Sequence, residues 1–176
     1  MKPKLALFTF SFLALTLITG CRNEGEKSQT DSLNMETGNK TPMSKEQLTD
    51  FGIKYAAAWC SQKPETVAAF FAHNGSLKVN ADKPAVGRDA ITKVALGFMT
   101  AFPDMIVAMD SLITGTNGTE FHWTLSGTNS GPGGTGKKVK VSGFELWHFD
   151  GEGLIQESIG RFDADEYNRQ LKVGVE

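Results

Sequence analysis

The sequence predicts an α+β domain in which a curved, mostly antiparallel sheet wraps around helices. Apolar residues with helical spacing gather in the first half of the domain and at its end. Between them lie four successive strand-like segments separated by turns. Consecutive strands joined in this way pair antiparallel, and helices gathered together cover one face of the sheet. The chain has 176 residues, 40% of them hydrophobic, which suits one soluble domain.

Three helices are predicted before those strands. Ser44 to Gln47 fits a capping box, which starts the first helix. Its apolar face recurs at three- and four-residue steps, at Leu48, Phe51, Tyr55 and Trp59. Lys63-Pro64 ends this helix, and Pro64 opens a short second one. The buried side of that second helix is expected at Val67, Phe70 and Phe71. A third helix is predicted over 88–102, ended by Phe102-Pro103-Asp104.

The strands are predicted from alternation and from the turns between them. A short strand over 76–80 precedes the third helix, with a loop over 81–87. The four later strands are expected over 105–114, 119–128, 137–149 and 154–162, followed by a closing helix over 163–171. The segment 119–128 alternates most clearly, with Phe121, Trp123 and Leu125 on one face. Residues 129–136, "NSGPGGTG", predict a flexible hairpin loop.

The first twenty residues carry the features of an export signal. Two lysines precede an apolar run, Leu5 to Ile18, that is too short to span a membrane comfortably. Ile18-Thr19-Gly20-Cys21 resembles the lipobox of bacterial lipoproteins, which implies cleavage before Cys21 and acylation of that cysteine. An ordinary cleaved signal with a chance cysteine is the alternative. We expect a lipoprotein signal peptide over 1–20, lipidated Cys21 and a disordered tether over 21–43, and the folded domain over 44–176.

The expected location follows from the same resemblance. Arg22 stands where an aspartate would mark retention at the inner membrane in the better-known sorting rule. We therefore expect a protein of the bacterial cell envelope, anchored by lipid to the outer membrane and facing the periplasm. Several acyl chains would hold it stably there.

Charge and cysteine use exclude several other classes. The formal net charge of −2 gives no broad attraction to nucleic acid, so no nucleic-acid partner is expected. If Cys21 is lipidated, Cys60 stands alone and is expected to be a buried, inert thiol. The three histidines lack metal-ligand spacing, and the glycine-rich segment fails as a phosphate-binding loop. Neither a metal nor a cofactor is expected.

Four segments of the domain read "AFPDMIV", "FHWTLSGTNSG", "HFDGEGLIQES" and "FDADEYNRQLKVG". In this order they resemble successive landmarks of the SnoaL-like family of polyketide and ester cyclases, within the nuclear transport factor 2-like superfamily. The landmark residues are Phe102-Pro103-Asp104, Trp123, Gly127-Thr128, Gly131, Asp150-Gly151, Ile155, Asp163 and Gln170-Leu171. "VGRDAI", 86–91, matches the family's entry into its third helix. The resemblance implies a cone-shaped fold with an apolar pocket and cofactor-free acid/base chemistry.

Such chemistry needs a carboxylate in apolar surroundings, where its pKa is raised. Asp163 stands where the family places an aspartate, but an aspartate directly before a helix is also a preferred cap. Glu145 shares the parity of an apolar strand face, unless Gly143 marks a bulge. Glu157 is a third candidate, for which pairing with Arg161 is the simpler prediction. Asp163 and Glu145 are thus the candidate catalytic residues.

Aromatic residues are expected to line or fill the pocket. The candidates are Tyr55, Trp59, Phe70, Phe98, Trp123, Phe144 and Trp147. Three functions remain open: cyclase-type or isomerase-type catalysis on a small carbonyl compound, non-catalytic binding of a small apolar ligand, or homodimerisation through an exposed sheet face. A buried, unpaired carboxylate in the cavity would favour the first, and a cavity with only apolar and hydroxyl groups the second.

Overall fold

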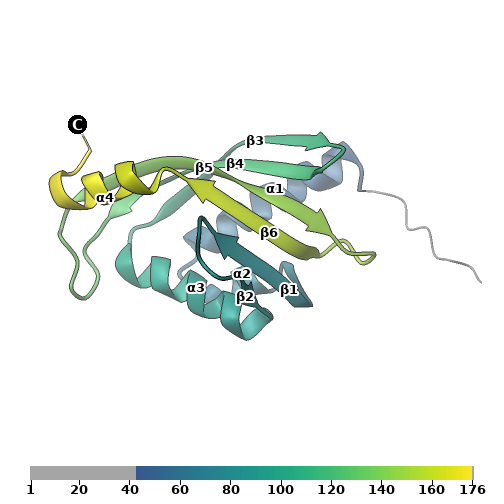
Figure 1. The fold of residues 1–176 in the computed structure, drawn as a ribbon, viewed down its shortest axis with the longest axis horizontal. Helices are drawn as coiled ribbons and strands as arrows, with labels where there is room; N and C mark the ends of the chain where they lie inside the picture. The colour runs from purple at the N-terminus through teal and green to yellow at the C-terminus, as the bar shows by residue number, and fades with distance from the viewer. Residues whose placement is uncertain (1–42, 176) are drawn as a thin grey trace, which may run out of the picture. The chain divides into compact units, whose positions relative to one another are not determined.

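The computed structural model describes residues 43–175, so the predicted signal peptide, Cys21 and nearly all of the predicted tether lie outside the described residues. The described chain forms four helices and six strands (Figure 1). In chain order they are α1 (Lys45–Cys60), α2 (Pro64–Ala68), β1 (Phe71–Val79), β2 (Ala85–Val86), α3 (Arg88–Ala101), β3 (Ile106–Gly115), β4 (Gly118–Thr128), β5 (Lys138–Phe149), β6 (Ile155–Phe162) and α4 (Ala164–Val173).

The six strands form one curved, unclosed sheet in the order β2-β1-β6-β5-β4-β3. Every neighbouring pair is antiparallel except β1 and β6, which run parallel. The sheet arches over α1, while α3 lies below β1 and α4 lies at one end (Figure 1). The predicted fold, a curved and mostly antiparallel sheet wrapped around helices, is confirmed.

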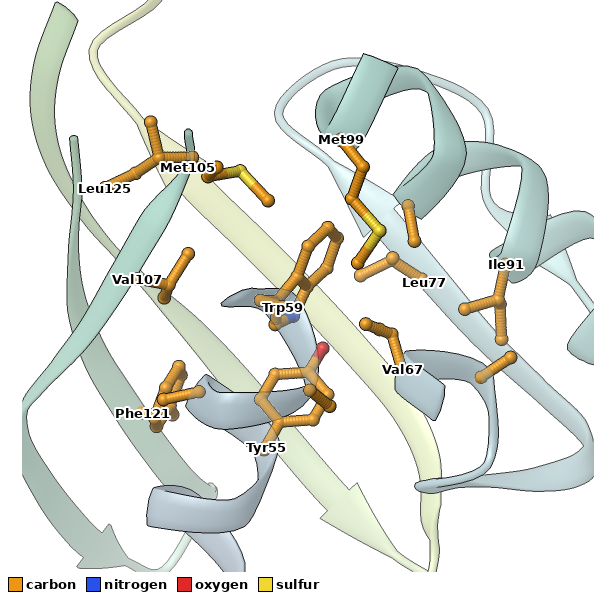
Figure 2. Packing of buried hydrophobic residues seen from close by; sticks show 14 of the residues in the cluster. Tyr55, Trp59, Val67, Leu77, Ile91, Met99, Met105, Val107, Phe121 and Leu125 are labelled. Atoms are coloured by element: carbon orange, nitrogen blue, oxygen red, sulfur yellow. The ribbon is translucent and has the colours of Figure 1, made fainter. Parts of the chain in front are cut away.

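Helix α1 is fixed at its start by the predicted capping box. The Ser44 hydroxyl accepts a hydrogen bond from the Gln47 backbone N–H at 3.3 Å, and the Gln47 side chain accepts one from the Ser44 N–H at 2.8 Å. Trp59, near the other end, occupies the centre of the core. Figure 2 shows it between Val107 and Phe121 of the sheet and Met99 of α3. The helix therefore contributes a continuous apolar side to the interior of the domain.

The structure contains strand in two places where the local pattern predicts helix or loop. The pattern places Phe71 in the second helix, but α2 ends at Ala68 and Phe71 begins β1. Phe71 is completely buried and pairs with Ile155 of β6. Residues 85–86, predicted as loop, form β2 by pairing with the middle of β1. In both places the strand forms by pairing with another segment of the chain. The segments themselves are too short to show the alternation of a strand, so the local pattern does not predict them.

The glycine-rich segment 129–136 packs on the end of α3. The Asn129 side-chain amide donates to the Ala101 carbonyl at 3.2 Å, and its oxygen accepts the Thr135 N–H at 2.8 Å. A Cβ on Gly131 would lie 1.8 Å from the Thr100 carbonyl oxygen, so only glycine fits this approach. The loop that the sequence predicts to be flexible is therefore held against the end of α3.

Several of the resembling motifs have structural roles. The Asp104 carboxylate accepts the Thr128 N–H at 2.7 Å, and this hydrogen bond lowers the pKa of Asp104. The Gln170 side chain accepts from the Lys140 N–H at 2.6 Å and donates to the Lys140 carbonyl at 2.9 Å. It continues the ladder of β5 where β6 has ended, since β6 pairs with β5 only from Gly143 onward. These motifs therefore specify the frame of the domain.

Candidate functional site

The site is built from side chains on the helix-facing side of three adjacent strands. Across β4, β5 and β6 one row consists of Phe121, Glu145 and Gly160. The row on one side is Trp123, Gly143 and Phe162, and the row on the other is Thr119, Trp147 and Ser158. The pairing of β4 with β5 has no register shift, so β5 is regular through Gly143. Alternation along a regular strand therefore turns Glu145 inward.

Glu145 is buried, with a relative exposure of 6%, and one of its oxygens is held by three donors. Its Oε2 accepts hydrogen bonds from the Ser158 hydroxyl at 2.6 Å, the Tyr55 hydroxyl at 3.0 Å and the Trp147 Nε1–H at 3.1 Å. Its Oε1 receives no hydrogen bond from the part of the chain that the structure describes. The carboxyl group is thus held in position through one oxygen, and the other oxygen is left for chemistry.

The surroundings make Glu145 a weaker acid than usual. Burial raises the pKa of the Glu145 carboxyl above its ordinary value, and the hydrogen bonds from Ser158, Trp147 and Tyr55 only partly oppose this. The pKa of Tyr55 is raised well above its ordinary value, first by burial and then by the nearby Glu145 charge. Because Oε2 already accepts three hydrogen bonds, a proton on Glu145 belongs on Oε1. The group is suited to both taking up and giving back a proton.

Glu145 borders a small, mostly apolar cavity of about 50 Å³. Its wall includes Trp59, Phe98, Trp123, Val141, Phe162 and Tyr167. Gly160 also lines it, and a Cβ at that position would lie 3.6 Å from the Glu145 Cγ. The missing side chain therefore leaves space beside the carboxyl group. Pockets for drug-sized ligands span about 300–1,000 Å³, so this cavity admits a small molecule or one end of a larger one.

The seven predicted pocket residues take different places. Phe70 packs edge-on against Tyr55 and is not part of the cavity wall. Trp59, Phe98 and Trp123 line the cavity beside Glu145. Tyr55 and Trp147 are completely buried next to the cavity and donate to Glu145. Phe144 instead lies on the opposite face of β5, with its ring centroid 5.6 Å from that of His122. The inward positions of this strand belong to its odd-numbered residues, so Phe144 cannot reach the cavity.

The other two candidate acids take different places. Asp163 caps α4: its side chain is exposed, and its Oδ1 accepts the Glu166 N–H at 2.9 Å. Glu157 does not pair with Arg161 but with His148, at 3.0 Å between Oε2 and Nδ1. His148 is its direct neighbour on β5, whereas Arg161 lies four residues further along the same strand. Of the three carboxylates, Glu145 is the one that lines the cavity.

Ser158 and Gly160 are site residues that the sequence does not single out. Both face Glu145 from β6, and both are small. Ser158 and Gly160 are two residues apart, so their side chains lie on the same face of β6. Two small residues on an inward face leave room for a buried side chain of the neighbouring strand, but which side chain that is becomes known only from the register between β5 and β6.

Cys60 and His122, two other side chains of reactive types, make contacts that serve the structure. The Cys60 sulfur, partly buried, accepts the Val107 N–H at 3.1 Å and so ties the end of α1 to β3. His122 pairs with Glu120 at 2.9 Å on the outer face of the sheet. Across residues 43–175, His, Cys, Asp and Glu side chains do not gather in threes as a metal site would need. Within the same range, each helix is too short or too polar to cross a membrane.

Comparison with known proteins identifies the family and the fold of this chain. Residues 52–171 match the family described as SnoaL-like polyketide cyclase. The chain therefore belongs to the SnoaL-like family, and its fold is the ketosteroid isomerase-like, or nuclear transport factor 2-like, cone. No curated protein matches the sequence.

Solved structures share the fold at low sequence identity. TsrD from Streptomyces laurentii superposes with a TM-score of 0.64 at 16% identity, covering 74% of this chain and 98% of that one. A protein of ketosteroid isomerase-like fold from Catenulispora acidiphila, solved with trimethylamine, gives 0.61 at 17% identity, with 69% and 91% covered. SalBIII, an epoxide hydrolase/cyclase-like enzyme of pyran ring formation in salinomycin, gives 0.59 at 16%, with 70% and 97% covered.

The burial of Glu145 predicts a specific pH dependence of stability. Its folded-state pKa lies above the ordinary value of 4.5, so the folded chain binds more protons than the unfolded chain between these two values. The contribution of Glu145 to the free energy of unfolding is fully present below about pH 4.5 and is lost as the pH rises through the folded-state pKa. The loss is about 1.4 kcal/mol for each pH unit that separates the two pKa values. Glu145→Gln should remove this fall, as measured by urea unfolding between pH 4 and 9.

The matched control is Glu157→Gln, which changes an exposed glutamate on the neighbouring strand. Its stability curve should keep the wild-type decline with pH. If Glu145→Gln and wild type lose stability in parallel over the whole range, Glu145 ionises normally and the description of its surroundings is wrong.

Proposed function

We propose that the domain carries out cofactor-free acid/base chemistry on a small carbonyl compound, with Glu145 as the group that takes and returns the proton. One observation carries the proposal: a buried carboxyl group with a raised pKa lines an apolar cavity and is held through a single oxygen. Carboxyl groups in such surroundings are suited to proton transfer at neutral pH. Membership of the SnoaL-like cyclase family supports the same class of reaction.

The reaction begins with proton removal from a carbon next to the carbonyl. Glu145 Oε1 takes this proton, the electron pair of the C–H bond forms a C=C bond, and the carbonyl π pair moves to oxygen as an enolate. In an isomerisation the substrate is a β,γ-unsaturated ketone, and the dienolate takes the proton back at its γ-carbon to give the conjugated ketone. In a cyclisation the enolate carbon attacks a second carbonyl of the same molecule, and the new alkoxide takes the proton. Both outcomes return Glu145 to its starting state.

Non-catalytic binding of a small apolar ligand is the second candidate function. It is favoured by the size of the cavity, about 50 Å³, and by its largely apolar wall. A carrier of this kind would bind the same compounds as the enzyme and release them unchanged.

Proton exchange separates the two functions. The full chain in lipid nanodiscs is mixed in D₂O with small cyclic ketones, and NMR follows replacement of the α-protons by deuterium. We expect exchange faster than with buffer alone and saturable in ketone. Saturable binding without accelerated exchange would reject catalysis and leave the ligand carrier as the function.

We also propose that the domain is anchored to the cell envelope by acylation of Cys21, on the periplasmic side of the outer membrane. The sequence Ile18-Thr19-Gly20-Cys21 supports this. Replacing Cys21 by alanine should abolish lipid attachment, leaving the chain either unprocessed or released. Mass spectrometry of the mature wild-type chain should find acyl groups on Cys21, and membrane fractionation should find only the wild type in the outer membrane. An unmodified mature Cys21 would contradict the anchor.

Homodimerisation through the outer face of the sheet stays a prediction. That face carries the His122–Glu120 pair and the side chain of Phe144. Analytical ultracentrifugation of the detergent-solubilised chain distinguishes a dimer from a monomer, and Phe144→Glu should dissociate a dimer that uses this face.

A further inference from the structure

The indole N–H of Trp123 is a second polar group beside the cavity, and the proton transfer proposed for Glu145 does not use it. Trp123 lines the cavity, yet its Nε1 is buried and lacks a hydrogen-bond partner. Among the described residues that are not exposed, it is the one fully buried side-chain nitrogen or oxygen in this condition. Folded proteins pair nearly all such groups, so an unpaired donor requires an explanation.

The neighbouring indole shows how the same group behaves when it is satisfied. Trp147 lies on the adjacent strand, and its Nε1–H donates to Glu145 at 3.1 Å. Trp123 lies on the far side of Glu145 from Trp147, in the row that also holds Gly143 and Phe162. The Trp147 indole therefore has an acceptor within the protein, whereas the Trp123 indole needs one from outside the chain.

Gly143 sets the position of the Trp123 ring. A Cβ on residue 143 would lie 2.7 Å from the Trp123 Cζ2, so any larger residue would displace the indole. The ring lies across β5 and meets Phe162 edge-on, with the ring centroids 6.1 Å apart. It is held beside the cavity by the sheet itself. Its Nε1 has almost no accessible surface, so a ligand oxygen entering the cavity that the ring lines reaches it only after a small shift of the indole or of a neighbouring wall side chain.

Trp123 and Glu145 are diagonal neighbours on adjacent strands, because Trp123 pairs with Gly143 and Phe121 pairs with Glu145. Diagonal positions of this kind are separated by about 7–8 Å. A small molecule between them can present an oxygen to the indole and an adjacent carbon to the carboxyl group. The rest of the wall is mostly apolar.

We infer that Trp123 donates its indole N–H to the carbonyl oxygen of the ligand, and that the ligand class is small, mostly apolar ketones with one exposed acceptor. This inference rests on the proposed function and deepens it, since the same hydrogen bond would stabilise the negative charge that develops on oxygen when Glu145 removes the α-proton. The ligand thus satisfies the donor that the protein leaves unpaired.

A pair of probes of the same shape tests the hydrogen bond. Cyclopentanone offers an acceptor, and methylenecyclopentane replaces its oxygen by a CH₂ group. In the full ¹⁵N-labelled chain in nanodiscs, cyclopentanone should move the Trp123 indole N–H resonance downfield, whereas methylenecyclopentane should leave it near its free position. The indole signals are assigned from single Trp→Phe variants.

Affinity provides the second measurement. Replacing Trp123 by 3-benzothienylalanine keeps the shape of the ring and removes the N–H. Cyclopentanone should bind about tenfold more weakly, while methylenecyclopentane should bind as to wild type. The matched control is Phe162→Leu, which enlarges the same cavity without removing a donor and should alter both affinities together. Trp123→Phe is the second variant if the analogue does not incorporate.

Three outcomes would overturn the inference. They are an equal loss of affinity for both probes when Trp123 is replaced, a Trp123 indole resonance that cyclopentanone does not move, and no detectable binding of cyclopentanone. Failure here is distinguishable from failure of the proposed function. Ketone exchange that depends on Glu145 but not on Trp123 rejects the donor role alone. Ketone binding that needs the Trp123 N–H without any exchange supports the donor role and rejects catalysis.

Discussion

Replacing Trp59 by alanine should lower the free energy of unfolding by about 3–5 kcal/mol. Trp59 is only 8% exposed and contacts the sheet on one side and α3 on the other, as Figure 2 shows. Its ring also meets Phe98 edge-on, with the centroids 6.0 Å apart. Alanine would leave a large void where α1 packs against both layers, and close-packed neighbours collapse only partly into such a void. Urea unfolding at fixed pH measures the loss.

The control is Ile53→Ala on the exposed side of the same helix. Ile53 is 54% exposed, so its removal should change stability by no more than about 0.5 kcal/mol. Both variants place alanine, a good helix former, in α1, and the difference between them reports burial alone. Similar unfolding midpoints for the two variants would show that Trp59 is not a core residue.

Glu145→Gln should slow α-proton exchange of small cyclic ketones by about 10²–10⁴-fold, the usual contribution of a general base. Glutamine keeps the size of the side chain, and its carbonyl oxygen can still accept hydrogen bonds from Ser158, Tyr55 or Trp147. It cannot take up the proton of the substrate. The affinity for the ketone should change far less than the exchange rate, because the cavity wall is unaltered.

Asp163→Asn is the matched control for this measurement, since it neutralises the other candidate carboxylate. Asparagine is as good a helix cap as aspartate, and Asp163 is exposed at the start of α4. Exchange and melting temperature should both stay near wild type. Loss of exchange in Asp163→Asn at unchanged stability, with normal rates in Glu145→Gln, would transfer the catalytic role to Asp163.

Much of the frame can be derived from short-range patterns. The capping box at Ser44 and Gln47 is readable because its two hydrogen bonds join residues three apart. The cap at Asp163 is readable for the same reason. Alternation along the strand places Glu145 on the inner face once the strand is taken as regular. Each of these features depends on neighbours within one turn or along one strand, and such neighbours are fixed by local geometry.

The sequence by itself determined the class of fold, the helix starts and the inward face of the strand over 119–128. Tertiary structure alone decided what Glu145 touches. Tyr55 lies 90 residues away in sequence, on α1, and Ser158 lies 13 residues away, on β6. The register between β5 and β6 placed Gly160 beside the carboxyl group, and parallel pairing with β6 made Phe71 a strand residue. Local periodicity predicts which way a side chain points. Its partners are set by contacts between segments that lie far apart in the sequence, and such contacts leave no local pattern to read.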